Sequence, residues 1–207
     1  EAAYHSGARL LVASTSEIYG KNTKIGLRED DDRVLGSPLK SRWSYSEAKA
    51  IDESLVESYV RELGLSAVIV RFFITVGPRQ TGRYGMVIPR FVSGALAGRP
   101  LEIHGDGTQT RCFCHVQDTI RALAGLMDAR HISGEIFNVG STERVTIEEL
   151  AQRVLAATGS GSEIVRIPYD EVYGQGIEDM LHRQPSIDKV TAAVDCAPTR
   201  SLDEILA

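Results

Sequence analysis

A tyrosine and a lysine four residues apart are the residues whose types and spacing point most clearly to chemistry. Tyr45 and Lys49 lie in the stretch Ser-Tyr-Ser-Glu-Ala-Lys-Ala, and on a helix this spacing places both side chains on one face. An ammonium group beside a phenol stabilises the phenolate, so the phenol can exchange a proton with a substrate. The spacing alone is a weak signal, because a core tyrosine and a solvated lysine produce it more often.

Hydroxyl side chains stand at the end of an apolar segment further upstream. Residues 9–15 (Arg-Leu-Leu-Val-Ala-Ser-Thr) form an apolar run that is typical of a buried parallel strand. Residues 66–73 form a second such run. Ligands of parallel sheets gather at the carboxyl ends of the strands. Thr15 and residues 73–77 both fall at such ends, so we expect them to face a ligand.

Hydrophobic periodicity predicts the elements that position these residues. Apolar residues recur at helical spacing between Trp43 and Leu63, and Gly64 closes the pattern, which predicts one long amphipathic helix. The apolar positions of this helix are Ala48, Ile51, Leu55, Tyr59 and Leu63. Together with the two apolar segments it predicts a right-handed parallel strand–helix–strand crossover.

Further elements are predicted downstream. Helices are expected over residues 88–96, 118–127, 146–158 and 202–206. Strands are expected over residues 101–104, 112–116, 135–139 and 164–167. Asp118 is expected to cap or charge the first turn of its helix, and Thr146 with Glu149 to form a cap. Apart from the last helix, residues 185–207 are expected to be a polar tail.

Four segments in this order resemble the extended short-chain dehydrogenase/reductase family of nucleotide-sugar epimerases, decarboxylases and dehydratases. They are the hydroxyl segment that contains Thr15, the Tyr45 and Lys49 pair, Arg71–Arg79 (Arg-Phe-Phe-Ile-Thr-Val-Gly-Pro-Arg), and Gly105–Arg111 (Gly-Asp-Gly-Thr-Gln-Thr-Arg). The resemblance implies an α/β fold, consisting of the C-terminal part of a Rossmann-type parallel sheet and a smaller α/β substrate-binding subdomain.

The same resemblance implies a division of the chain. Residues 1–80 are expected to be the remainder of an NAD-binding domain, to which later segments such as 112–140 return. Residues 81–207 are expected to form mainly the nucleotide-sugar-binding subdomain. No glycine-rich turn stands between an opening strand and a helix, so roughly a hundred N-terminal residues of the family fold are expected to be missing. The chain alone is therefore expected to bind NAD poorly and to be inactive.

Roles at the reacting end of the site follow from the resemblance. A phenolate at Tyr45 is expected to remove a proton from a sugar hydroxyl while the C4 hydride passes to bound NAD, which gives a 4-keto sugar. Lys49 is expected to hold the nicotinamide ribose, and Thr15 to hydrogen-bond the reacting oxygen. Phe73 is expected to line the nicotinamide.

The resemblance also implies substrate contacts. Arg111 matches an arginine whose planar fork pairs with the diphosphate. His104 matches a position where an aromatic ring flanks the nucleotide base, and Arg183 resembles an arginine that contacts the nucleotide. Ile74 departs from the family pattern. Other members of the family have an asparagine at this position, and its amide helps to bind the sugar diphosphate. Losing that hydrogen bond costs about 1–3 kcal/mol if its partner stays buried.

Two features bear on which reaction of the family is catalysed. The 4,6-dehydratases carry an Asp-Glu pair where this chain has Ser16 and Glu17, so dehydration is disfavoured. A glutamate at this position resembles UDP-glucuronate decarboxylases and leaves decarboxylation open. Residues 40–45 and 75–86 look more like proteins grouped with UDP-glucose 4-epimerases.

We therefore predict C4 epimerisation of a UDP-glucose, UDP-galactose or UDP-glucuronate type of sugar. Decarboxylation of UDP-glucuronate is the alternative within the same family. A truncated, noncatalytic relative that holds a nucleotide sugar through Arg111 and His104 is the alternative outside catalysis. The resemblance also implies a homodimer formed through the helix that carries Tyr45 and Lys49.

The composition is that of a globular protein, with 207 residues, 43% of them hydrophobic and 25% charged. A formal charge of −5 argues against a general nucleic-acid surface, although local arginines can still bind a diphosphate. The arginines that are candidates for binding a diphosphate are Arg79, Arg83, Arg90 and Arg111. No apolar run approaches the roughly twenty residues of a membrane span.

The three cysteines match neither a zinc site nor a disulfide framework. Cys112 and Cys114 flank a single residue of a predicted strand, where their side chains would point to opposite faces. We expect reduced cysteines in a cytoplasmic protein, with no bound metal. The acidic run at residues 29–32 is expected to be a solvated loop.

Overall fold

A computed structural model describes residues 1–82, 86–174 and 178–207. In chain order its elements are α1 (Ala2–Ser6), β1 (Leu10–Thr15), η1 (Ser16–Tyr19), η2 (Ser41–Trp43), α2 (Ser44–Leu63), β2 (Ala67–Phe72), β3 (Ile74–Val76), α3 (Val87–Leu96), β4 (Leu101–His104), β5 (Thr110–His115), α4 (Val116–Asp128), η4 (Arg130–Ile132), β6 (Ile136–Val139), β7 (Arg144–Thr146), α5 (Ile147–Thr158), β8 (Ile164–Ile167), α6 (Tyr169–Tyr173), β9 (His182–Arg183), α7 (Asp188–Val194) and α8 (Leu202–Leu206).

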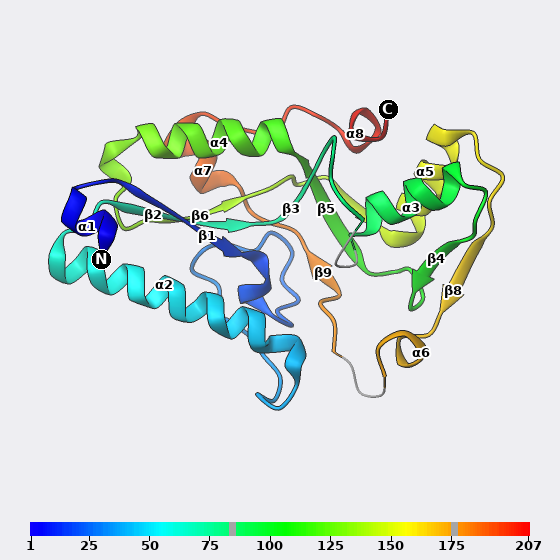
Figure 1. The fold of residues 1–207 in the computed structure, drawn as a ribbon, viewed down its shortest axis with the longest axis horizontal. Helices are drawn as coiled ribbons and strands as arrows, with labels where there is room; N and C mark the ends of the chain where they lie inside the picture. Colours follow the sequence, from blue (N-terminus) through cyan, green and yellow to red (C-terminus); the bar gives the residue numbers. More distant parts are fainter. Residues whose placement is uncertain (83–85, 175–177) are drawn as a thin grey trace.

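The first part of the fold is a parallel sheet between two layers of helices (Figure 1). The strand order is β1-β2-β6, with Val12 opposite Ile69 and Val70 opposite Phe137. Figure 1 shows α2 along one face of this sheet and α4 with α7 along the other. The parallel pairing of β1 and β2 across α2 confirms the predicted strand–helix–strand unit. The carboxyl ends of β1 and β2 therefore lie at one edge.

The second part combines two smaller sheets with helices α3, α5, α6 and α8. Strands β3, β5 and β7 form one sheet, in which β9 also pairs with β5, and β4 pairs with β8 in the other. Its core contains Phe91 of α3, Ile103 of β4, Phe113 of β5 and Leu150 of α5. The second part of the fold is thus a packed unit with its own core.

Several local signals act as the sequence predicts. Gly64 ends α2 in the left-handed conformation, with φ of 69°, which a residue without a Cβ adopts without strain. Thr146 and Glu149 form a reciprocal capping box at the start of α5. The three cysteines are free, and Cys112 and Cys114 are both buried. No helix in the described ranges is long and apolar enough to cross a membrane.

Two sequence-based expectations need correction. The N-cap of α4 is His115, whose Nδ1 accepts a hydrogen bond from the backbone N–H of Gln117 at 3.2 Å. Asp118 lies in the first turn but does not cap the helix, because its carboxylate accepts hydrogen bonds from Thr199. The predicted polar tail contains a further helix, α7, which buries Val190 against the first sheet.

The long helix α2 is oriented in a way that its apolar pattern does not indicate. Its buried residues are Ser46 and Glu53, whereas Ile51 and Leu55 are 60% and 56% exposed. Glu53 faces the sheet, where it accepts hydrogen bonds from Arg71 Nε at 2.9 Å and Nη2 at 2.7 Å. A buried charged pair, and not the apolar stripe, therefore fastens this helix to the sheet.

Candidate active site

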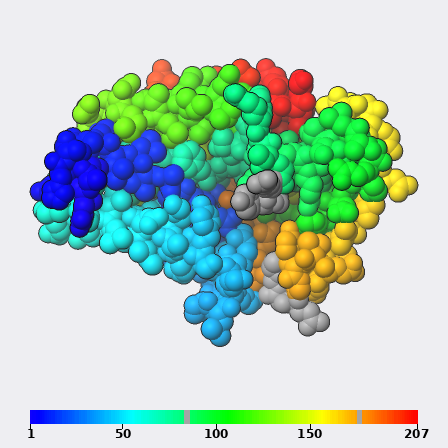
Figure 2. Space-filling view, viewed as in Figure 1, coloured from blue at the N-terminus to red at the C-terminus, as the bar shows by residue number. Residues whose placement is uncertain are grey.

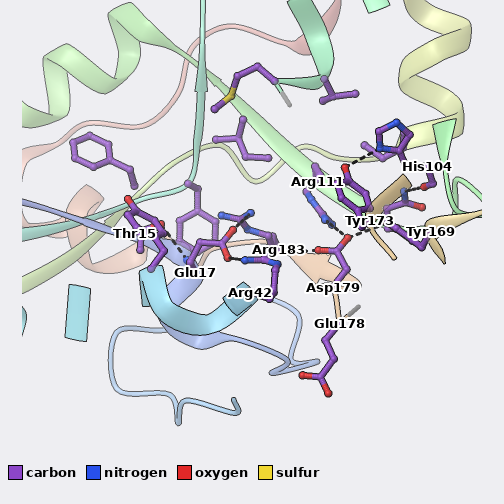
Figure 3. A pocket seen from close by; sticks show the side chains of 18 of the residues that line it. Thr15, Glu17, Arg42, His104, Arg111, Tyr169, Tyr173, Glu178, Asp179 and Arg183 are labelled. Atoms are coloured by element: carbon purple, nitrogen blue, oxygen red, sulfur yellow. Dashed lines mark hydrogen bonds and ion pairs between the residues drawn. The ribbon is translucent and has the colours of Figure 1, made fainter. Parts of the chain in front are cut away.

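A cleft of about 1130 Å³ opens at the carboxyl ends of the first sheet and extends to the second part of the fold. It brings together most of the residues that the sequence predicted: Thr15, Glu17, Tyr45, Phe73, Ile74, His104, Arg111 and Arg183. Lys49 is not among the described residues that line it. Figure 3 shows the charged groups of Glu17, Arg42, Arg183, Asp179 and Arg111 gathered across this cleft.

The predicted acid/base lies near the start of α2. Tyr45 is 52% exposed and lines the cleft, and no described side chain hydrogen-bonds its phenol. Thr15 lies at the end of β1, where its Oγ1 accepts a hydrogen bond from the backbone N–H of Glu17 at 3.2 Å. Lys49 Nζ lies 3.2 Å from Asp52 Oδ2. The Tyr45 phenol is therefore available to a ligand.

Glu17 forms the centre of a charged cluster beside Thr15. Arg183 Nη1 lies 2.7 Å from Glu17 Oε1, and Arg42 binds the other carboxylate oxygen. Burial opposes ionisation of Glu17, but Arg183 and Arg42 outweigh it and hold the pKa of Glu17 below its ordinary value. Arg183 Nη2 also donates to Ser16 Oγ at 2.5 Å. Glu17 is therefore a carboxylate anion held between two guanidinium groups.

One nitrogen atom of the Arg183 guanidinium group, Nε, makes no hydrogen bond to a described residue. This atom is buried. A buried donor without a partner costs about 1–3 kcal/mol, so sites of this kind commonly receive a ligand or a water molecule. The orphaned N–H is consistent with a ligand atom at this end of the cleft.

Arg111, the predicted diphosphate ligand, is engaged within the chain. Its Nη1 donates to the backbone carbonyl groups of Thr110 at 2.9 Å and Met180 at 2.8 Å. Its Nη2 lies 3.1 Å from Asp179 Oδ2, and Tyr169 Oη donates to the same oxygen at 3.0 Å. The guanidinium group thus holds the segment before β9 in place.

A second carboxylate from this segment faces the loop before α2. Glu178 accepts hydrogen bonds from Trp43 Nε1 at 2.7 Å and Lys21 Nζ at 3.1 Å, and Lys40 Nζ lies 2.8 Å away. These contacts hold the pKa of Glu178 at about 2, below the ordinary value for glutamate. In Figure 2 the orange segment lies beside the light-blue stretch that precedes α2. Two neighbouring acidic residues, Glu178 and Asp179, therefore line the cleft.

His104 lies between Arg90 and Tyr173. Arg90 Nη1 is 2.8 Å from His104 Nε2, and Tyr173 Oη is 2.8 Å from His104 Nδ1. A guanidinium group only donates, so Nε2 accepts and the neutral ring carries its proton on Nδ1. Burial and the charge of Arg90 lower the pKa of His104, which favours this neutral form. The His104 and Tyr173 rings lie 5.3 Å apart in an edge-to-face arrangement, and both line the cleft.

The remaining predicted residues lie on the walls of the cleft or outside it. Phe73 is only 2% exposed and packs against Tyr19 in the core, with its ring centroid 6.2 Å away. Ile74 lines the cleft together with Val87. Arg79 is not among the described lining residues, and Arg83 lies outside the described residues.

Sequence reasoning missed several groups that the fold adds to the cleft. The main ones are Arg42, Tyr169, Glu178 and Asp179. Arg42 stands three residues before Tyr45, which is the one local signal that connects any of them to the predicted chemistry. The others come from a segment distant in sequence, without a regular apolar pattern that would place it.

A family model described as "NAD dependent epimerase/dehydratase family" matches residues 1–140. Among curated proteins, UDP-N-acetyl-alpha-D-glucosaminuronate decarboxylase of Bacillus cytotoxicus is 41% identical over 205 residues, which cover 99% of this chain and 63% of that protein. UDP-glucuronic acid decarboxylase 1 of Danio rerio is 33% identical over 198 residues, covering 96% of this chain and 45% of that protein.

Solved structures give the same result for the fold. UDP-glucuronic acid 4-epimerase of Bacillus cereus, in complex with UDP-glucuronic acid and NAD, superposes with a TM-score of 0.85 at 28% identity, covering 99% of this chain and 61% of that one. UDP-glucose 4-epimerase of Thermotoga maritima, with UDP-glucose, gives 0.85 at 28%, covering 99% and 63%. The predicted Rossmann-type α/β fold is therefore confirmed.

The chain spans less than two thirds of the length of these relatives, with at most 63% of each of them covered. The family match extends over the segments that contain the Thr15 hydroxyl, the Tyr45 and Lys49 pair and Arg111. These are the segments from which the sequence predicted the family. The chain belongs to the NAD-dependent epimerase/dehydratase family.

Proposed function

We propose that this chain is the substrate-binding and acid/base part of an NAD-dependent enzyme that decarboxylates a UDP-linked uronic acid. The observation that carries the proposal is the position of Glu17, which lies beside Thr15 and between Arg42 and Arg183 at the cleft. The 41% identity to a protein named as a UDP-sugar decarboxylase supports the same reaction class.

The charge balance of the cleft suits an acidic sugar nucleotide. Among the described residues, Arg42, Arg111 and Arg183 form ion pairs with two carboxylates, those of Glu17 and Asp179, which leaves one positive charge of this group uncompensated. The chain as a whole has a net charge of −5, so this positive cluster is local. A local excess of positive charge attracts an anionic ligand. We propose that a sugar carboxylate shares the guanidinium groups of Arg42 and Arg183 with Glu17.

The residues of the cleft fit the nicotinamide end of NAD. The Tyr45 phenol has no described partner, and Lys49 lies one turn further along α2, where its Nζ is 3.2 Å from Asp52 Oδ2. The described ranges contain no glycine-rich turn between a strand and a helix that would hold the pyrophosphate. When bound, NAD accepts a hydride from C4 of the sugar and later returns it. We propose that the remaining length of the relatives supplies the rest of the NAD site.

The proposed steps use the residues of this chain in order. Tyr45 takes the proton of the C4 hydroxyl, and Thr15 hydrogen-bonds the same oxygen. The C4 ketone is then β to the carboxylate, so the C5–C6 bond breaks, carbon dioxide leaves and its electron pair moves into the enolate at C4 and C5. Tyr45 and Thr15 stabilise the enolate oxygen. A proton from solvent then adds to C5, and Tyr45 returns its proton to O4 when the ketone is reduced.

Epimerisation at C4 is the second candidate, and it is the reaction that the sequence favoured. Both reactions begin with the same oxidation at C4, and the solved neighbours include UDP-glucuronic acid 4-epimerase and UDP-glucose 4-epimerase. The epimerase retains the sugar carboxylate and needs no group that acts on it. The Glu17 cluster therefore favours decarboxylation.

The apolar part of the cleft bears on the sugar. Ile74 replaces the asparagine of the family pattern, and its neighbours along the cleft include Met86 and Val87. Apolar side chains suit the methyl group of an acetamido substituent better than a hydroxyl group. We propose UDP-N-acetylglucosaminuronate as the preferred substrate and UDP-glucuronate as the second.

A homodimer through α2 is also proposed. Ile51, Leu55 and Leu63 of this helix are all large and exposed, and a shallow groove runs beside Ile51 and Leu55. An exposed apolar stripe of this kind is typical of a protein–protein interface. Leu55→Glu is expected to shift the protein to the monomer in sedimentation analysis, while Glu57→Gln on the neighbouring polar face leaves the assembly unchanged. A protein that is already monomeric before substitution would contradict the dimer.

The reaction is tested on the chain extended upstream to the length of its relatives. The extended protein is incubated with NAD and each UDP-uronate, and the product is identified by mass spectrometry. A product that has lost carbon dioxide supports the proposal, and Glu17→Gln, which removes the carboxylate charge between Arg42 and Arg183, is expected to slow this loss. A product of unchanged mass and inverted C4 would favour the epimerase. No turnover of either substrate would leave a noncatalytic relative.

A further inference from the structure

Three donors from separate segments converge on the carboxylate of Asp179. Arg111 Nη2 lies 3.1 Å from its Oδ2, Tyr169 Oη donates to the same oxygen at 3.0 Å, and Arg42 Nη2 lies 3.6 Å from Oδ1. Figure 3 shows Asp179 between Arg111 and Tyr169 on one side and Arg42 on the other. Guanidinium groups and a hydroxyl group are also the donors that recognise a phosphate. The described cleft thus holds a preformed anion site that a side chain of the protein already fills.

The engagement of Arg111 makes the overlap with a ligand direct. Its Nη1 is used by the backbone carbonyl groups of Thr110 and Met180, and its Nη2 by Asp179. The side chain is only 11% exposed. A ligand phosphate that reaches the terminal nitrogen atoms of this guanidinium group must therefore take the place of a group that is already bound there.

We propose that Asp179 is an internal competitor for the diphosphate of the nucleotide sugar, and that the diphosphate binds by displacing Asp179 from Arg111. The proposal rests on the nucleotide-sugar ligand proposed above. Asp179 keeps the buried cation neutralised when no ligand is bound, because a buried unpaired charge is costly. It also lowers the affinity of the cleft for diphosphates. Asp179 is then a residue that determines affinity and does not take part in the chemistry.

Asp179→Asn isolates the charge of this competitor. The amide keeps the size of the side chain and one oxygen for Arg111 and Tyr169, so the fold is expected to be retained. A hydrogen bond to a neutral acceptor is weaker than one to a carboxylate. The variant is therefore expected to bind UDP about tenfold more tightly than the wild-type chain.

Glu178→Gln is the matched control. Glu178 is the adjacent residue, lines the same cleft and also carries one negative charge, but its partners are Lys21, Lys40 and Trp43 and not Arg111. If the removal of any negative charge near the cleft increased the affinity for UDP, both variants would bind UDP more tightly by the same factor. A direct displacement predicts a larger gain for Asp179→Asn, which persists when salt screens charges at a distance.

Calorimetric titration of UDP into the full chain and both variants decides between these cases. Thermal unfolding checks that each variant is folded, and Asp179→Ser replaces Asp179→Asn if the amide variant is not. Trp43 is the single tryptophan of the chain and donates a hydrogen bond to Glu178. Its fluorescence is therefore expected to change when UDP displaces the neighbouring Asp179, which gives an independent signal.

Each outcome bears on a different statement. Tighter UDP binding by Asp179→Asn alone supports the competitor. Equal or weaker binding by Asp179→Asn overturns it and makes Arg111 a structural anchor of residues 178–183. Equal gains in both variants overturn it in favour of a general charge effect. No UDP binding by any of the three proteins overturns the nucleotide ligand of the proposed function, and this inference with it.

Discussion

At the Arg111 end of the cleft the charged side chains are paired with one another, whereas the Tyr45 phenol, the proposed acid/base, is half exposed and has no described partner. Arg111 and Asp179 are held by contacts within the chain. Tyr45 depends instead on the placement of its helix. The proposed anion-binding end is therefore organised by contacts within the chain, while the Tyr45 phenol has no partner among the described residues.

Buried contacts between α2 and the first sheet determine the position of Tyr45. Glu53 lies one turn after Lys49 on α2 and forms a buried pair with Arg71 of β2. The Oγ of Ser14, next to Thr15, also donates to Glu53. The same carboxylate thus connects the helix of the acid/base to the strand that carries the hydroxyl. The exposed Tyr45 phenol is therefore positioned by a buried network of polar side chains, Ser14, Glu53 and Arg71.

The largest expected effect separates the reacting phenol from all other contacts. In the extended enzyme, Tyr45→Phe is expected to lower turnover by about 10²- to 10⁴-fold, because it removes the hydroxyl group that is proposed to exchange the C4 proton. UDP binding is expected to remain, since the anion-binding end is unchanged. Stopped-assay product analysis measures turnover, and Tyr59→Phe on the same helix is the control. Comparable turnover in Tyr45→Phe would remove the phenol from the mechanism.

The next effect concerns the anchor beneath Tyr45. Arg71→Met leaves the Glu53 carboxylate buried without its partner, which is expected to lower the free energy of unfolding by about 3–5 kcal/mol. Urea denaturation measures this change. The double variant Glu53→Leu with Arg71→Met removes both charges and is expected to recover most of the stability. A single variant as stable as the wild type would show that the pair does not fasten α2.

The smallest effect concerns the acidic segment at the other end. Hydrogen bonds from Lys40, Trp43 and Lys21 hold the pKa of Glu178 at about 2, below the 4.5 of an ordinary glutamate. A carboxyl group with a lower pKa in the folded state stabilises the fold above its ordinary pKa. This contribution is lost as the pH falls through the folded value.

Glu178→Gln is therefore expected to be less stable than the wild type at neutral pH. The difference should shrink as the pH falls from 4.5 towards 2, because the wild-type carboxyl group then becomes neutral as well. Urea denaturation at a series of pH values measures it. A difference that does not vary with pH would mean that shape, and not charge, distinguishes the two side chains.

Local sequence patterns predicted most of the scaffold and several of the residues that line the cleft. The periodicity between Trp43 and Leu63 predicts α2, and the Thr146 and Glu149 spacing predicts a capping box that the structure contains. Thr15 and Phe72 line one cleft because the parallel strands β1 and β2 end at the same edge of the sheet. Tyr45 lines the same cleft from the first turn of α2. These features depend on short-range patterns that a sequence displays directly.

The rest depends on contacts between distant segments. Asp179 faces Arg111 only because β9 pairs with β5, and no spacing indicates that pairing. A histidine N-cap is outside the usual Ser, Thr, Asp and Asn signal, so the sequence did not indicate His115, although Asp118 does lie in the first turn of α4 as one of the two predicted alternatives. The apolar stripe of α2 was visible, but its direction relative to the sheet was not.

The proposed reaction rests on the fate of the sugar carboxylate carbon. The extended enzyme is supplied with NAD and UDP-N-acetylglucosaminuronate labelled with ¹³C at C6, and carbon NMR follows the label. Decarboxylation at the Glu17 cluster predicts that the label leaves the sugar and accumulates as carbon dioxide and bicarbonate. A label that stays on the sugar while C4 inverts would contradict the decarboxylase and identify the chain as part of a 4-epimerase.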